Sequence, residues 1–323
     1  MFTRRSVITY LIAFLFILAL NFFLPRMMPG DPLMAIYGNE ALIAMTPELK
    51  AHLIERLALD QPLWRQFGAY LLALVQGDVG YSYYYKAPVS SIVLGRLPWT
   101  LLLVGTALII STLSGIVLGI ESGWRRGSRR DKSLLTGLMT ISGFPDFFLG
   151  MLLLIGFGVT LGIFPLSGAI TPYSGLSGAA LVLDVLHHLF LPLTALTLCH
   201  IGASYLLTRN TMVTVLKNPY ILTAKAKGIT DQAVRYQHAG RNALLPVITQ
   251  TGIQLGRMIS GVIFIEIVFA YPGLGYLTYE ALLARDYPVI QGVLLVVAVF
   301  VLIANFLVDL SYSRLDPRIR YAH

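Results

Sequence analysis

The side chains best suited to metal binding or proton transfer are the adjacent histidines His187 and His188. As a metal site they have a single nearby acidic residue, Asp184. Two adjacent residues of a helix also point in different directions, so the two histidines do not face one ion together. The single cysteine, Cys199, lies in an apolar run and has no second cysteine for a disulfide or a thiolate metal site. We therefore expect no metal centre and no catalytic nucleophile. The histidines are expected at a membrane interface, and Cys199 is expected to act as a small apolar residue.

Motifs that mark common enzymes are also missing from the sequence. The phosphate-binding pattern G-x-x-x-x-G-K-[ST] does not occur, and neither do H-E-x-x-H and G-x-S-x-G. The sequence therefore predicts that the chain is not an enzyme, has no catalytic residues and binds no cofactor of its own.

Two charged residues, Arg257 and Glu266, fall inside an apolar run. Charges within a membrane are costly and therefore face protein or water. Arg257 and Glu266 are nine positions apart, which corresponds to about 13.5 Å of helix rise and is too far for a direct ion pair between them. We expect Arg257 to face a translocation pathway or an acidic neighbour. Glu266 is expected either to line that pathway or to brace the turn at Tyr271-Pro272-Gly273.

The elements that must position these residues are apolar helices. Apolar residues make up 56% of the 323 residues, 12% are charged, and the mean hydropathy is +0.72. A bilayer core of roughly 30 Å requires about 20 apolar residues of helix, and six such runs occur. They lie at about 7–25, 97–120, 134–163, 188–212, 246–270 and 288–312. Arg4 and Arg5 resemble the start of a signal peptide, but no small-x-small cleavage site follows, so we expect a retained span.

The basic residues predict the orientation of these spans. Sixteen of the 24 lysines and arginines fall in segments that alternate sides correctly for six spans. They are Arg4, Arg5, Arg125, Arg126, Arg129, Arg130, Lys132, Arg209, Lys217, Lys225, Lys227, Arg235, Arg241, Arg314, Arg318 and Arg320. Because cytoplasmic segments are enriched in Lys and Arg, both termini are predicted to be cytoplasmic. The net charge of +8 then reflects topology, and we expect no nucleic-acid partner.

The polar segment 218–248 is predicted to form two short helices. Asn218 and Pro219 suit the N-cap and first position of a helix, and Gly228 suits its end. Thr230-Asp231 would begin the second helix, and Pro246 would mark entry into the fifth span. A helix of about nine residues is not stable alone. It must therefore dock, either on the membrane surface or, as its small residues Thr223, Ala224 and Ala226 favour, in a groove of a partner.

The region 26–96 is predicted to carry short amphipathic helices outside the membrane. Thr46-Pro47-Glu48 reads as a helix start, followed by Leu49, Leu53 and Leu57 at helical spacing. A second stretch runs from Leu63 to Leu74. An irregular outer loop is expected around Pro172, Gly175 and Gly178. Within the spans, glycines recur at four-residue spacing and predict close helix packing inside the subunit. They are Gly115, Gly119, Gly123, Gly158, Gly162, Gly252 and Gly256.

Several ordered motifs resemble one family of transport proteins. TAKAKGITDQAVRYQHAGRNALLPVI is similar to the cytoplasmic loop of binding-protein-dependent ABC import permeases, and most of all to that of the dipeptide, oligopeptide and nickel branch. That branch usually has YIRTARAKG, here Tyr220–Gly228, and RNALLPVI, here Arg241–Ile248. Leu222 stands where many other ABC importers have an acidic residue. Further matches are MPGDP, GDVGYS, FIEIVFAYPGLG, RDYPVIQG and VDLSYSRLDPRIRY.

The resemblance implies an all-α polytopic membrane protein with a type I ABC importer fold. Residues 1–95 would hold the first span and the external region, 96–312 the transmembrane domain with a coupling loop at 213–245, and 313–323 a cytoplasmic tail. The coupling helix would contact an ATPase through Tyr220, Thr223, Ala224, Lys225, Ala226, Lys227 and Gly228. Implied partners are two ABC ATPase subunits holding ATP and Mg, a second homologous permease subunit and an extracytoplasmic substrate-binding protein. The location would be the cell (inner) membrane, in contact with lipid.

Alternatives remain open for the cargo and the class. The same family carries peptides and nickel or metal chelates, and we favour peptides. An ion-coupled secondary transporter would more often show inverted repeats, and no convincing repeat is present. A membrane-embedded enzyme would need a nucleophile, a base or a metal cluster inside the spans.

Overall fold

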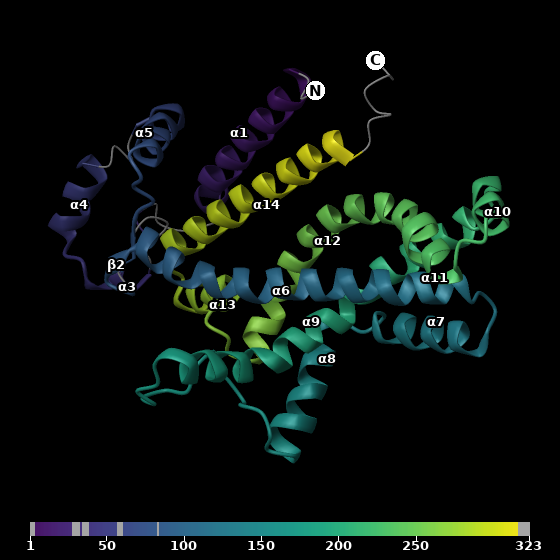
Figure 1. Ribbon diagram of the computed structural model, residues 1–323. Coiled ribbons are helices and arrows are strands. Elements are labelled where there is room, and N and C mark those ends of the chain that lie inside the picture. The colour runs from purple at the N-terminus through teal and green to yellow at the C-terminus, as the bar shows by residue number, and fades with distance from the viewer. Residues whose placement is uncertain (1–3, 28–32, 34–38, 57–60, 83, 316–323) are drawn as a thin grey trace. The chain divides into compact units, whose positions relative to one another are not determined.

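The computed structural model describes residues 4–27, 33, 39–56, 61–82 and 84–315, and these are mainly helical (Figure 1). The MPGDP segment at 28–32, Leu57 and most of the C-terminal tail, including Arg318 and Arg320, lie outside the described residues.

Long apolar helices dominate the described chain. They are α1 (Arg4–Met27), α6 (Val89–Trp124), α9 (Gly178–Val215), α12 (Arg241–Val268) and α14 (Tyr287–Leu315). In the described residues, α6, α9 and the Tyr287–Phe306 part of α14 are each long and apolar enough to cross a membrane. Two bent helix pairs raise this number to as many as five, and the apolar part of α1, Ile8–Phe23, is shorter. The membrane class is therefore supported, while the number of six spans stays a prediction.

The third predicted span, 134–163, is not one straight helix. It consists of α7 (Arg129–Ile141), α8 (Asp146–Leu153) and a π-helical continuation, η1 (Leu154–Thr160). The axis bends by 99° between Arg129–Ile141 and Asp146–Thr160 (Figure 1). Pro145 explains the break, because a proline disfavours helical conformation in the residue before it.

The fifth span also differs from its predicted start. A short helix, α11 (Asp231–Ala233), passes through a π-helix, η2 (Val234–Gly240), directly into α12. Pro246 therefore lies inside α12 and does not mark its start, because α12 already begins at Arg241. The axis bends by 43° between Gln250–Ile259 and Gly261–Val268.

Short elements fill the N-terminal region, and the two predicted helices are among them. These elements are α3 (Asn39–Ala44), α4 (Pro47–Arg56), α5 (Leu63–Val75) and a two-stranded antiparallel hairpin of β1 (Tyr81–Ser82) and β2 (Ala87–Pro88). The predicted start of α4 is confirmed, since Thr46 Oγ1 accepts a hydrogen bond from the backbone N–H of Leu49 at 3.3 Å. Before α14 the chain forms a further helix that the sequence analysis missed, α13 (Leu274–Ala284).

The chain divides into two compact units. One holds Leu101–Tyr271 with residues from Ala304, and the other holds the chain up to Thr100 with Pro272–Ile303. The second unit has its own apolar cluster, the hairpin core, in which α6, α13 and α14 meet. Its buried members are Val89, Val93, Leu274, Leu277, Ala281, Val289 and Val293. The division into residues 1–95, 96–312 and 313–323 remains a prediction.

Glycines bring α6 and α9 into close contact within the first unit. A Cβ added to Gly119 would lie 2.6 Å from Thr208 Cβ and 2.8 Å from the carbonyl oxygen of Tyr205. Gly115 and Gly123 approach Ser204 and Met212 in the same way. The predicted packing inside the subunit is confirmed for these three glycines. At Gly256, by contrast, an added Cβ would meet nothing within 4 Å.

Candidate functional site

The short helix α10 (Pro219–Ala226) starts and stops where the sequence predicts. Asn218 has extended backbone (φ −72°, ψ 143°), Pro219 follows at the first position, and Gly228 adopts φ +75°. The N–H of Gly228 donates to the carbonyl of Lys225 at 3.0 Å, and the N–H of Ile229 donates to that of Ala224 at 3.3 Å. This pair of bonds is the Schellman motif, which favours glycine because its C′ residue is left-handed.

One face of α10 is buried against the rest of the chain. Ile221 is 1% exposed and Ala224 is 6% exposed, and both belong to an apolar cluster that we name the coupling core. Its buried members are Ile120, Met212, Val215, Ile221, Ala224, Val234, Ala239 and Ala243. Since an eight-residue helix is unstable alone, this contact with α6, α9, η2 and α12 holds α10 in place. Burying a side chain such as Ile221 contributes about 1.5–3 kcal/mol.

The opposite face of α10 is exposed and contains most of the predicted coupling residues. Tyr220, Thr223, Lys225, Ala226, Lys227 and Gly228 are all exposed, and Leu222 is 67% exposed. Ala224 differs, because its side chain points into the coupling core and is not part of the outward surface. The hydroxyl of Tyr220 accepts a hydrogen bond from Asn242 Nδ2 at 2.7 Å, which links α10 to the start of α12.

Polar contacts join the α10 region to the end of α6. Lys225 Nζ and Arg235 Cζ lie 5.1 and 5.0 Å from the centre of the Trp124 ring. Arg235 Nη1 and the hydroxyl of Tyr236 each donate to Glu121 Oε1 at 2.7 Å. The hydrogen bond to Glu121 raises the pKa of Tyr236 above its ordinary value. The indole and the carboxylate thus connect α6 with both α10 and η2.

The start of α11 also follows the sequence prediction. Thr230 is the N-cap, and its Oγ1 accepts from the N–H of Ala233 at 3.4 Å, with Asp231 in the first turn. In η2, Gly240 has little space for a side chain, because an added Cβ would lie 2.9 Å from the carbonyl oxygen of Arg235. The chain therefore packs closely where the polar segment becomes the fifth span.

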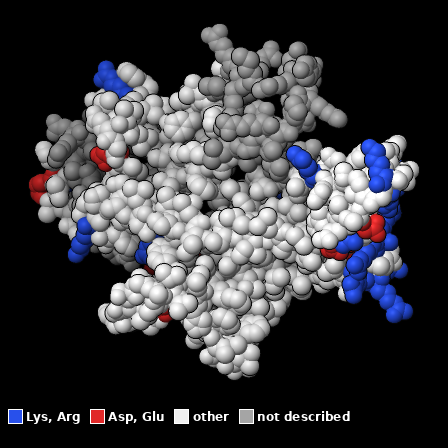
Figure 2. Space-filling model, in the orientation of Figure 1, with Lys and Arg blue, Asp and Glu red and all other residues white. Residues whose placement is uncertain are grey.

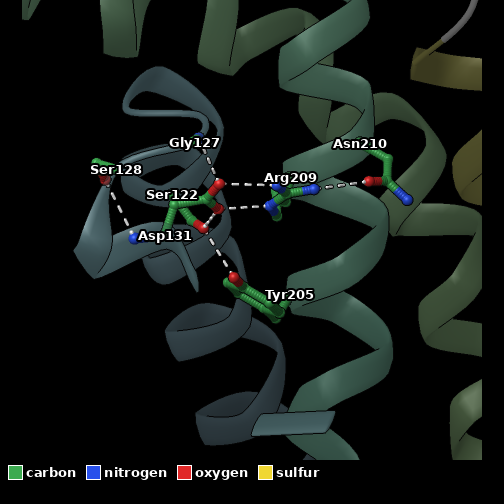
Figure 3. Close-up of polar contacts among 7 residues, drawn as sticks. All are labelled: Ser122, Gly127, Ser128, Asp131, Tyr205, Arg209 and Asn210. Carbon is green, nitrogen blue, oxygen red and sulfur yellow. Dashed lines mark hydrogen bonds and ion pairs between the residues drawn. The ribbon is translucent and has the colours of Figure 1, made fainter. Parts of the chain in front are cut away.

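A second polar group, which the sequence analysis missed, centres on Asp131 at the start of α7 (Figure 3). The Asp131 carboxylate accepts hydrogen bonds from Arg209 of α9 at 2.6 and 2.8 Å and from Ser122 of α6 at 2.5 Å. One signal was present: Ser128 precedes Asp131 by three residues and caps α7, with its Oγ accepting from the N–H of Asp131 at 3.2 Å. That spacing locates the acid in the first turn of α7 but does not identify Arg209 as its partner.

Lysine and arginine side chains gather over the turn between α6 and α7 (Figure 2). The exposed members of this group are Arg125, Arg126, Arg129, Arg130 and Lys132. Their clustering at one end of these helices is what the positive-inside rule expects of a cytoplasmic turn.

The two charges of the fifth span lie in different surroundings. Arg257 is exposed on the isolated chain and forms no ion pair within the residues that the structure describes. Glu266 is 0% exposed, and its carbonyl oxygen accepts from the N–H of Tyr271 at 2.8 Å. Nearby in the first unit, Asp146 Oδ2 lies 3.3 Å from His200 Nε2, a pair that the sequence analysis did not single out.

The adjacent histidines contact backbone carbonyl groups, and the cysteine is buried. His187 Nε2 lies 2.9 Å from the carbonyl oxygen of Ile163, and His188 Nδ1 lies 2.9 Å from that of Asp184. Cys199 is buried and forms no disulfide. Across the described part of the chain, no group of three or more His, Cys, Asp or Glu side chains is arranged to hold a metal ion.

Together these features define an α-helical membrane subunit that presents a short, firmly seated helix on its polar surface. Two family models cover nearly the whole sequence: the N-terminal model of binding-protein-dependent transport system membrane components matches residues 1–104, and the model of binding-protein-dependent transport system inner membrane components matches residues 115–321. The chain belongs to this family of inner membrane permease components, which are not themselves enzymes.

Named relatives match along almost their whole length. The chain is 36% identical to the dipeptide transport system permease protein DppB of Escherichia coli K12, over 95% of each sequence. It is 34% identical to the di/tripeptide transport system permease protein DppB of Pseudomonas aeruginosa UCBPP-PA14, over 94% of this chain and 93% of the relative. A putative peptide transport system permease protein of Brucella abortus 2308 is 38% identical, over 95% of each.

A solved structure supports the fold. A chain of the MetNI methionine ABC transporter, in an inward-facing conformation, superposes with a TM-score of 0.56 at 15% identity. The match covers 70% of this chain and 96% of that one. At this identity the likeness concerns the fold alone, which is that of an ABC importer permease.

Proposed function

We propose that this chain is the membrane-spanning subunit of an ATP-driven importer of short peptides. The observation that carries the proposal is α10, which buries Ile221 and Ala224 in its own subunit and exposes the opposite face. A helix seated in this way can transmit a push from a second protein. The names of the relatives favour peptide as cargo over nickel or a metal chelate.

The exposed face of α10 is proposed as the contact with a cytoplasmic ATPase. Tyr220, Thr223, Lys225, Ala226 and Lys227 supply the outward surface, with Gly228 ending the helix. Ala224 supports this surface from beneath. Two ATPase subunits would hold ATP and Mg, and a second permease subunit would complete the path. A binding protein would deliver the cargo from outside, and both termini of this chain would lie in the cytoplasm.

The exposed charge of α12 is proposed to face the translocation path. Arg257 would be costly in lipid, so its exposure on the isolated subunit favours a surface covered by water or by the second permease. Glu266 is buried beside the turn at Tyr271-Pro272-Gly273 and is better suited to bracing that turn than to lining a path.

The coupling role is tested by substitutions at Gly228 in the reconstituted transporter with its ATPase subunits. Gly228 has φ +75°, and an added Cβ would meet nothing within 4 Å, so a side chain there costs backbone strain without a clash at its Cβ. Gly228→Val should strain the end of α10 by about 1–2 kcal/mol, whereas Gly228→Asn should be tolerated. We expect Gly228→Val to insert normally but to transport less peptide per ATP hydrolysed. Equal coupling in both variants would contradict the docking role.

The class and the cargo are tested with the wild-type protein. Uptake of a labelled dipeptide into vesicles should require ATP, the ATPase subunits and the binding protein. Uptake driven by an ion gradient without ATP would instead indicate a secondary transporter. Titration of the cognate binding protein with dipeptides and with nickel chelates decides the cargo, and binding of chelates alone would overturn the peptide proposal.

A further inference from the structure

The Asp131 carboxylate is surrounded by four hydrogen-bond donors. Arg209 donates through Nε and Nη2 at 2.6 and 2.8 Å, the hydroxyl of Ser122 at 2.5 Å and the N–H of Gly127 at 2.8 Å. The side chain of Asp131 is 2% exposed and that of Arg209 is 14% exposed. The carboxylate is therefore shielded from water, and both of its oxygens are occupied, while the guanidinium stays partly exposed.

These contacts tie three helices together at one point (Figure 3). Ser122 comes from α6, Asp131 from α7 and Arg209 from α9, 78 residues after Asp131. The buried hydroxyl of Tyr205, one helical turn before Arg209, lies 2.7 Å from Ser122 Oγ and extends the group along α9. A two-point bond from a planar guanidinium fixes orientation as well as distance, so the rotation of α9 relative to α7 is set here.

The same helix ends form the seat of α10. Ile120 of α6 and Met212 of α9 belong to the coupling core, two and three residues from Ser122 and Arg209 respectively. Gly123 lies against Met212, so α6 and α9 are in backbone contact at this level. A displacement of α10 therefore acts directly on α6 and α9, two of the three helices that the Asp131 group joins.

Stability alone is a weak reason for such a pair. Desolvating two charges often offsets their attraction, and apolar replacements of a buried pair are commonly as stable. A pair that fixes the relative orientation of helices is better explained by a need to move them together. A mechanical link between sites requires elements that shift as one body rather than deform separately.

We infer that the Asp131–Arg209 pair is a clamp that makes the ends of α6, α7 and α9 follow α10 as one body. Asp131 is thus a positioning residue for the coupling of ATP hydrolysis to transport. The inference rests on the proposed function as an ATP-driven importer. It adds that coupling depends on a polar group beneath the docking surface, which no ATPase residue needs to touch.

The test is Asp131→Asn in the complete reconstituted transporter, with peptide transported per ATP hydrolysed as the readout. The substitution keeps the shape of the side chain but removes its charge. We expect the ratio to fall about tenfold, within the range of measured coupling effects, while binding of the ATPase subunits is retained. Asp184→Asn is the matched control: the Asp184 carboxylate also accepts hydrogen bonds, two of them from Thr171, but lies outside the clamp. Its ratio should equal that of the wild type.

Arg209→Lys separates an effect on folding from an effect on the coupling of ATP hydrolysis to transport. Lysine retains the positive charge beside Asp131 but cannot form the two-point bond. A lowered ratio with normal membrane insertion supports the clamp even where Asp131→Asn fails to accumulate. An unchanged ratio in Arg209→Lys, or in an inserted Asp131→Asn protein, overturns it. If the wild type itself transports without ATP, the proposed function fails instead, so the two failures are distinguishable.

Discussion

Two buried carboxylates, Asp131 and Asp286, organise their surroundings in different ways. Asp131 is held by the guanidinium of Arg209, which comes from a different helix far along the chain. Asp286 accepts hydrogen bonds from neutral donors, the hydroxyl of Ser82 at 2.5 Å and the N–H of Val289 at 3.3 Å. Around Asp286, the hairpin core supplies a largely apolar contact among α6, α13 and α14.

The difference shows two ways to join helices. Around Asp286, apolar packing brings the elements together, and the hydrogen bond from the Ser82 hydroxyl to the carboxylate connects the β1–β2 hairpin to the start of α14. Around Asp131, apolar packing is supplemented by a charge-assisted pair that also restricts rotation. The stricter joint lies next to α10, the surface through which we propose that force enters.

Removing each group should therefore have unequal effects on stability. Asp131→Ala leaves the partly buried guanidinium of Arg209 without its carboxylate, and we expect a loss of up to about 3–5 kcal/mol. Ser82→Ala removes a neutral donor to Asp286, for which we expect about 1–3 kcal/mol. Thermal unfolding of the purified proteins in one detergent measures both. Equal losses would show that the two carboxylates are held alike and would remove the contrast.

The close contact of α6 and α9 should be sensitive to a single added methyl group. In Gly119→Ala the new Cβ would lie 2.6 Å from Thr208 Cβ, so the helices must separate. We expect a loss of about 1–3 kcal/mol. Gly105→Ala on the same helix is the control, because an added Cβ there meets nothing within 4 Å. It should be neutral or stabilise by about 0.5–1 kcal/mol through helix propensity. A similar loss at both sites would mean that packing against α9 is not the cause.

The Trp124 ring should contribute less than either of these features. Trp124→Leu keeps an apolar side chain at the edge of the coupling core but removes the ring beside Lys225 and Arg235. We expect a loss of about 0.5–2 kcal/mol from the cation–π contacts. Comparing Trp124→Leu with Trp124→Phe isolates the ring, since phenylalanine keeps an aromatic face. If both variants unfold at the same temperature as the wild type, these contacts do not stabilise α10.

The smallest expected effect concerns Tyr85 of the hairpin region. Burial, and then the charge of Glu280, raise the pKa of Tyr85 above its ordinary value, and its hydroxyl donates to Glu280 Oε2 at 3.2 Å. A raised pKa means that the folded state favours the neutral phenol. The contribution of Tyr85 to the free energy of unfolding is therefore fully present below about pH 10, the pKa of tyrosine in the unfolded chain, and is lost as the pH rises above that value. The unfolding temperature of Tyr85→Phe should therefore fall less between pH 8 and 11 than that of the wild type. Unfolding curves at pH 8 to 11, taken as the difference between the two proteins, provide the measurement.

The sequence by itself determined the features that depend on residues close together along the chain. Apolar runs identified a membrane protein, since burial in a bilayer depends on composition over about 20 residues. Asn218-Pro219 and Gly228 located the ends of α10, because caps act within a few residues of the backbone they satisfy. The motif of Tyr220–Ile248 and the ordered matches along the chain identified the permease family.

Only the tertiary structure decided which surfaces and partners these elements use. It turned Ala224 inward, joined Asp131 to Arg209 and divided the predicted third span by a bend of 99°. It also showed that α11 continues through η2 into α12, with no break at Pro246. These outcomes depend on how segments far apart in the sequence pack together. Helical periodicity gives the direction of a side chain around its own axis, but the neighbouring helix decides whether that direction leads to a partner, to the core or to the outside.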